Sequence, residues 1–96
     1  MEKKEIPYQK TVFVCVNVRE GRQACANPGV GGDKVCERLK EGIKARGLKG
    51  KVRVARSGCL DRCAEGPNLF IYPEGAWYSH VREADVDAIL DKLTPP

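Results

Sequence analysis

The residues best suited to chemistry in this chain are its cysteines, which stand at positions 15, 25, 36, 59 and 63. Thiolate sulfur is a soft ligand that binds zinc, copper(I) and the iron of iron-sulfur clusters. The start of the chain, Met1 to Lys10, is charged and lacks the apolar stretch of a signal peptide, so we expect a cytoplasmic protein. In that reducing compartment several cysteines indicate metal binding or redox chemistry more often than structural disulfides.

Length and composition limit what the rest of the chain can do. Its 96 residues, 42% hydrophobic and 31% charged, predict one domain over residues 1–96 in which residues 1–10 form a loose N-terminal arm. The longest apolar run, Val12 to Val16, is too short to span a membrane. The formal charge of +4 is spread over interleaved acidic and basic residues, so we expect no nucleic-acid partner and no membrane partner.

Two segments position the first two cysteines. Thr11 to Val18 is rich in β-branched residues and nearly continuous in apolar character, which predicts a strand covered on both faces with Cys15 towards its end. From Asn17 to Gly32 the chain is polar and rich in glycine, which predicts a loop that contains Cys25. Ordered loops of this length in compact domains usually have a function.

The third cysteine falls on a predicted helix. Asp33 can cap a helix that runs to about Arg46, and Gly47 can adopt the left-handed conformation that ends it. Cys36 shares the apolar face of this helix with Val35, Leu39 and Ile43. We therefore expect Cys36 in the core rather than among metal ligands.

The last two cysteines follow a second predicted strand. Lys51 to Arg56 alternates between apolar and charged residues, as a half-buried strand does. Residues 57–67, which contain Cys59 and Cys63, are bounded by glycines and a proline. Such a segment predicts a loop or at most one helical turn.

The remaining residues predict a hairpin and a closing helix. Asn68 to Tyr72 and Ala76 to Val81 flank a short turn, and Glu83 to Leu93 carries an apolar stripe at helical spacing. We expect His80, the single histidine, on a strand face rather than on a metal. The aromatic residues expected in the hairpin core or in cross-strand pairs are Phe70, Tyr72, Trp77 and Tyr78.

The resulting order is β-α-β-β-β-α, which belongs to the α/β class. A right-handed βαβ unit followed by an antiparallel hairpin and a helix predicts a thioredoxin-like arrangement, with a four-stranded mixed sheet and two helices. Sites in such folds lie outside the carboxyl ends of the parallel strands. This rule brings together Cys15, Cys59 and Cys63, and the long loop can carry Cys25 to the same place.

Four thiolates in this arrangement leave several interpretations open. A 2Fe-2S cluster needs two pairs of thiolates, and the spacing favours it. Structural zinc is the main alternative, although only Cys59 and Cys63 have the close spacing of a zinc knuckle. A thiol-disulfide oxidoreductase would need a C-x-x-C at the start of a helix, which the chain lacks. Reduced structural thiols are disfavoured because three of the four lie in polar or glycine-rich loops.

Longer motifs around these cysteines resemble a known family. They are Phe13-Val14-Cys15-Val16 with Ala24-Cys25-Ala26, Gly58-Cys59 with Cys63 and Gly66-Pro67, and Tyr72-Pro73-Glu74-Gly75-Ala76-Trp77-Tyr78 with Val86-Asp87. Together they resemble the thioredoxin-like 2Fe-2S ferredoxins over nearly the whole chain. A related site occurs in the small iron-sulfur subunit of respiratory NADH dehydrogenases, where the first two cysteines are closer together. The longer loop here favours the free-standing ferredoxins.

The resemblance implies both a cofactor and a function. It implies a 2Fe-2S cluster bound by Cys15, Cys25, Cys59 and Cys63, one-electron transfer between redox partner proteins, and often a homodimer. Cys36 is not part of the ligand pattern that the family implies. The sequence holds no Ser-His-Asp set, phosphate loop or dinucleotide fingerprint, so we expect a carrier rather than an enzyme.

Overall fold

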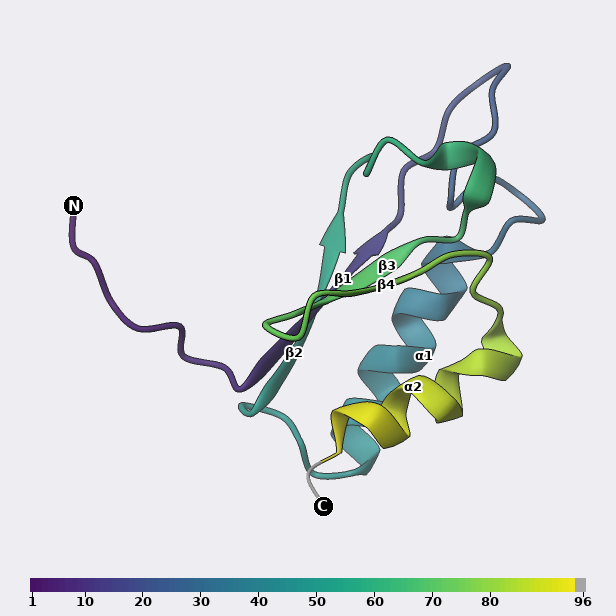
Figure 1. Cartoon of the computed structure of the whole chain (residues 1–96). Coiled ribbons are helices and arrows are strands. Elements are labelled where there is room, and N and C mark those ends of the chain that lie inside the picture. Colours follow the sequence, from purple (N-terminus) through teal and green to yellow (C-terminus); the bar gives the residue numbers. More distant parts are fainter. Residues whose placement is uncertain (95–96) are drawn as a thin grey trace.

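The chain folds into a four-stranded sheet and two helices (Figure 1). The computed structural model describes residues 1–94. In chain order its elements are β1 (Lys10–Cys15), α1 (Gly32–Ala45), β2 (Val52–Ser57), β3 (Leu69–Tyr72), β4 (Ala76–Tyr78) and α2 (Val86–Leu93), with 3-10 turns at Cys63–Glu65 and Glu83–Asp85. The predicted order β-α-β-β-β-α is confirmed.

The sheet places the ends of β1 and β2 at one edge. Its strand order is β2-β1-β3-β4, with β1 parallel to β2, and with β3 antiparallel to both β1 and β4. In the parallel pair, Cys15 at the end of β1 lies beside Ser57 at the end of β2. The loops that follow both strands therefore leave from the same edge, as the sequence predicts.

Both helices cover the same face of the sheet (Figure 1). Strand residues alternate between the two faces of a sheet, and on β1 and β3 every second residue is apolar and points towards the helices. These side chains are fully buried: Val12, Val14, Leu69 and Ile71. Burial of each such side chain stabilises the fold by about 1.5–3 kcal/mol. No helix among the described residues is long and apolar enough to cross a bilayer.

A glycine inside α1 allows the two helices to pack closely. Gly42 lowers helix propensity, but a Cβ atom at this position would collide with the side chain of Leu90 on α2. The close approach of α1 and α2 therefore explains a glycine that is unfavourable for the isolated helix.

Aromatic side chains stack on the opposite face of the sheet. The rings of Phe13 and Phe70 have centroids 4.8 Å apart, and those of Phe70 and Trp77 are 5.9 Å apart. Phe70 and Trp77 are cross-strand partners, as predicted for the hairpin. Tyr78 packs against the core. Tyr72 is 48% exposed and so lies outside the core, but it is the cross-strand partner of Thr11 on β1, which agrees with the prediction of cross-strand pairs.

Two element boundaries differ from the sequence prediction. The first strand ends at Cys15 rather than Val18, because the chain turns into the loop where its partner strand β2 ends, and Val18 is exposed. Asp33 does not cap α1, which begins at Gly32 after Gly31 in the left-handed region. The main-chain N–H of Gly32 donates to the carbonyl of Cys25 at 2.6 Å, so the loop itself satisfies the start of the helix.

The end of the hairpin also differs from the prediction. β4 stops at Tyr78, because the N–H of His80 donates to the carbonyl of Glu65 and the N–H of Val81 donates to that of Pro67. These bonds tie the chain after β4 to the cysteine loop. His80 lies outside the strand with a φ of 50°, so its prediction as a strand-face residue is wrong.

Candidate metal centre

The first two cysteines form a buried pair. Cys15 is 0% exposed at the end of β1, and Cys25 is 1% exposed in the loop that follows. Main-chain hydrogen bonds fix this loop, since the N–H of Ala26 donates to the carbonyl of Asn17 and that of Gly32 donates to the carbonyl of Cys25. The two thiols are close enough for Cys15 to contribute to the raised pKa of Cys25, whose main cause is burial.

The second two cysteines form a pair at the surface. The sulfur atoms of Cys59 and Cys63 are 3.3 Å apart, and Cys59 is exposed. Asp61, with a φ of 64°, turns its main-chain N–H towards Cys59 Sγ at 3.3 Å. The guanidinium of Arg19 reaches the same sulfur at 3.2 Å. Both donors favour thiolate, and the hydrogen bond from Asp61 is the main cause of the lowered pKa of Cys59.

The two pairs adjoin each other. The pKa of Cys63 is raised chiefly by its hydrogen bond with Cys59 and then by burial, and negative charge on Cys15 adds to the shift. Among residues 1–94, no three side chains of the usual ligand types gather closely enough to hold a single metal ion. Two adjoining pairs suit a centre with two metal ions, each taking two sulfurs, better than one zinc ion.

In the protein without a metal centre, these pKa shifts predict unequal thiol reactivity. At neutral pH, Cys59 should react with iodoacetamide faster than Cys25, because only thiolate is nucleophilic and Cys59 has the lower pKa. The ratio of the two rates should fall as the pH rises towards the raised pKa of Cys25, because the Cys59 thiol is already ionised there and that of Cys25 only begins to ionise. Mass spectrometry of peptides after brief anaerobic labelling measures the two rates, and equal labelling at pH 7 would contradict the arrangement.

Gly66 leaves room for the buried pair. A Cβ atom at this position would lie 2.8 Å from Cys25 Sγ and 3.3 Å from the carbonyl oxygen of Cys63. A side chain at residue 66 would therefore displace Cys25. The glycine thus serves the site directly, in addition to ending the 3-10 turn at Cys63–Glu65.

Asn68 connects the buried pair to the aromatic face, and sequence analysis did not identify it as a site residue. It is the one buried polar side chain among residues 1–94, at 1% exposure. Its amide nitrogen lies 3.6 Å from Cys25 Sγ and donates to the carbonyl of Arg62 at 2.7 Å. Its oxygen accepts from Trp77 Nε1 at 3.3 Å and from Ser79 Oγ at 3.0 Å. The only sign of Asn68 in the sequence was a polar residue directly before an apolar strand.

Cys36 lies apart from the other four cysteines. It is 0% exposed and packs in the core cluster with Val35 and Leu39, as predicted from its helical position. Burial raises its pKa, which keeps the thiol neutral. Cys36 therefore behaves as a small apolar side chain.

Replacing Cys36 by serine is expected to destabilise the fold by about 1 to 3 kcal/mol, because a hydroxyl group would be buried among apolar side chains. Urea unfolding measures this loss, and the content of the metal centre should stay unchanged. Cys36→Ala is the matched control, since it buries no polar group. A Cys36→Ser protein that is stable but has lost its metal would place Cys36 among the ligands instead.

Fold and site together define a thioredoxin-like protein with two adjoining pairs of thiols. A scan against protein-family models finds no match. A 2Fe-2S ferredoxin of Clostridium pasteurianum is 33% identical over 81 residues, covering 83% of this chain and 79% of the relative. A 2Fe-2S ferredoxin of Aquifex aeolicus (strain VF5) is 34% identical over 87 residues, covering 86% and 77%.

Solved structures agree with these relatives. The crystal structure of the wild-type thioredoxin-like [2Fe-2S] ferredoxin from Aquifex aeolicus superposes with a TM-score of 0.80 at 35% identity, covering 88% of this chain and 84% of that one. The chain belongs to the family of thioredoxin-like 2Fe-2S ferredoxins. The fold class and the family predicted from the sequence are confirmed.

Proposed function

We propose that this chain is a one-electron carrier whose 2Fe-2S cluster is bound by Cys15, Cys25, Cys59 and Cys63. Membership of the ferredoxin family supports the cofactor and the function. The observation that carries the ligand assignment is the presence of two adjoining thiol pairs, one buried and one at the surface. Four thiols grouped as two pairs match the donor set of a two-iron cluster.

Neighbouring groups in this proposal stabilise negative charge on the sulfurs. When bound, the cluster supplies a site that accepts and releases one electron without breaking a bond in a substrate. Arg19 and the N–H of Asp61 donate towards Cys59, and the amide of Asn68 donates towards Cys25. Such hydrogen bonds to ligand sulfurs raise the reduction potential, because they favour the more negative reduced state.

The surface pair provides a place for electron exchange with partner proteins. A surface hollow of about 710 Å³ opens beside Cys63, with Arg19 and Arg62 in its lining. Asp61 and Glu65 line it as well, so two acids balance the two cations and the charge of the hollow favours neither an acidic nor a basic partner surface. In this proposal the protein exchanges electrons with a donor and an acceptor and transforms no substrate itself.

A cytoplasmic homodimer is the proposed state of the protein. The five cysteines, which are all free thiols in the structure, motivate the cytoplasmic assignment, because thiols stay reduced in that compartment. The aromatic stack of Phe13, Phe70 and Trp77 on the uncovered sheet face supports association, because Trp77 remains 45% exposed in one chain. Sedimentation of the wild type beside Trp77→Lys tests it, and a wild type that sediments as a monomer would exclude the dimer.

The cluster assignment is tested on anaerobically purified protein. We expect iron and sulfide analysis to give two of each per chain, together with visible absorption. Serine variants at the four proposed ligands should lose this absorption, whereas Cys36→Ser should keep it. A colourless protein that holds one zinc ion through the same thiols, even after anaerobic reconstitution with iron and sulfide, would contradict the proposal.

A further inference from the structure

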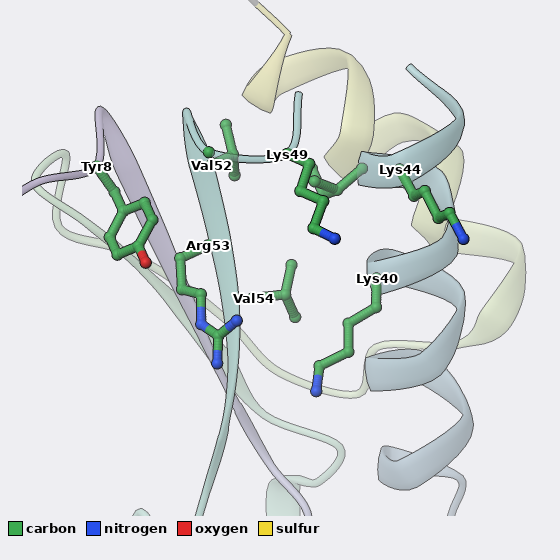
Figure 2. A pocket seen from close by; sticks show the side chains of 9 residues that line it. Tyr8, Lys40, Lys44, Lys49, Val52, Arg53 and Val54 are labelled. Atoms are coloured by element: carbon green, nitrogen blue, oxygen red, sulfur yellow. The ribbon is translucent and has the colours of Figure 1, made fainter. Parts of the chain in front are cut away.

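A second concave site lies far from the cysteines, between the edge strand β2 and helix α1. This hollow has a volume of about 370 Å³, and its apolar floor is formed by Ile43, Val52 and Val54. Figure 2 shows Val54 pointing into the gap between the strand and the helix. The turn at Lys49 and Gly50 closes one end, and Tyr8 stands at the other side of β2. Hollows of this volume with apolar linings are typical of small-molecule sites.

The rim of this hollow is positively charged. Lys40, Lys44, Lys49 and Arg53 line it, and no acidic residue does. Lys40 and Lys49 reach into the gap between β2 and α1, whereas Arg53 lies on the side of β2 that faces Tyr8 (Figure 2). Within residues 1–94 none of these four cations forms an ion pair or a side-chain hydrogen bond. Their charge is therefore available to an anionic ligand.

The hollow lies at the opposite end of the fold from the thiols. β2 runs from Val52, in the hollow, to Ser57, which precedes the cysteine loop. α1 likewise runs from Gly32, which contacts the carbonyls of Cys15 and Cys25, to the hollow at Ile43. A ligand here would not touch the sulfurs, so this site has a function separate from electron exchange.

We propose that this hollow, which we call the cationic hollow, binds a nucleoside di- or triphosphate. Lysine and arginine side chains bind phosphate oxygens through charge-assisted hydrogen bonds. The phenol ring of Tyr8, on one side of β2, offers a surface on which a base can stack, while Lys40 and Lys49 on the other side offer their charges to the phosphates. Lys40 and Lys49 point into the gap, with Arg53 across β2, and these cations suit an anionic polyphosphate, whereas a neutral ligand would leave them unused (Figure 2).

A small molecule fits this shape better than an acidic segment of a protein. The hollow is bounded by the strand, the helix and the Lys49–Gly50 turn, so it has limited extent along β2. An added peptide strand would use the open edge of β2 and would need neither the floor beneath it nor Tyr8. The ring of Tyr8 beside a rim of cations is therefore the feature that favours the nucleotide.

Binding is tested by calorimetry on the cluster-loaded protein, with ATP, inorganic triphosphate and adenosine as probes. We expect one saturable site for ATP. The double variant Lys40→Glu/Lys49→Glu should weaken it at least tenfold, because two charge-assisted contacts become repulsive. Lys34→Glu/Arg38→Glu is the matched control, since it makes the same change of net charge on exposed residues of α1 outside the hollow. That control should weaken ATP binding less than threefold.

Two further measurements exclude other causes of ATP binding. One asks whether the protein binds only the phosphates of ATP, and the other asks whether ATP removes iron from the cluster. Tyr8→Leu should weaken ATP binding without affecting inorganic triphosphate, and the visible absorption should not change on binding. The proposal is overturned if ATP shows no saturable binding, if triphosphate binds as tightly as ATP, or if ATP bleaches the absorption by extracting iron. An acidic peptide that binds the edge of β2 while ATP does not would also overturn it.

Discussion

Replacing Gly32 by alanine is expected to destabilise the protein by about 3 kcal/mol and to remove its cluster. Helix propensity alone predicts the opposite, because alanine is favoured over glycine in a helix by about 1 kcal/mol. The added Cβ atom would lie 2.5 Å from the carbonyl oxygen of Cys25 and 2.7 Å from that of Cys15. Both obstacles are main-chain atoms, so the loop and the end of β1 must both move.

The same displacement explains the expected loss of the cluster. Gly32 anchors Cys25 through the 2.6 Å hydrogen bond to its carbonyl, and its position sets the spacing between Cys25 and Cys15. Urea unfolding and visible absorption measure the two effects. Gly58→Ala is the control, because nothing lies within 4 Å of its added Cβ atom. A Gly32→Ala protein of unchanged stability with a full cluster would show that this contact is not needed.

Replacing Asn68 by leucine is expected to lower both the stability and the reduction potential. The free energy of unfolding should fall by about 2 to 4 kcal/mol, because several buried or half-buried polar groups lose their partner together. The potential should fall by about 40 mV, the equivalent of losing about 1 kcal/mol of hydrogen bonding to Cys25 for a one-electron couple. Electrochemistry and urea unfolding of the loaded protein measure the two changes.

A neighbouring variant isolates the contact with sulfur. Ser79→Ala removes a hydroxyl that donates to the Asn68 oxygen but leaves the Asn68 amide nitrogen facing Cys25. We expect it to lower the stability slightly and to leave the potential within about 10 mV of wild type, since it removes no donor to a ligand sulfur. Equal shifts of potential in Asn68→Leu and Ser79→Ala would refute a direct effect of Asn68 on Cys25.

The periodic parts of the sequence predicted the fold well. The apolar stripe that includes Cys36 faces one layer of packing, so local pattern and tertiary burial agree there. The strand before Cys15 was predicted to be covered on both faces, but only its helix-facing side is fully buried, and Phe13 on the other side is half-buried. The thioredoxin-like order then followed from the sequence of elements. The grouping of the cysteines was predictable as well, because parallel strands end at the same edge of a sheet.

What the sequence did not predict depends on contacts between distant segments. Asp33 looks like a helix cap, yet the cap of α1 is Gly31, two residues earlier, and the N–H of Gly32 donates to the carbonyl of Cys25. Asn68 looks like the polar start of a strand, yet it is buried beside Cys25 with Trp77 and Ser79 as partners. Arg19 carries no local signal for its contact with Cys59, forty residues later in the chain. Such pairings become visible only when the loops are placed in space.

The separation of the apolar core from the cysteine site bears on how the protein matures. Cys36 is the only cysteine in the core cluster, whose other members come from the sheet, the two helices and the turns that join them. Zinc-finger domains, by contrast, are unfolded until their metal arrives. Because none of the four proposed ligands belongs to this core cluster, we expect the scaffold to fold before a cluster is bound. The folded chain would then be the form that an assembly machinery receives, and cluster delivery would be a separate and later event in its life.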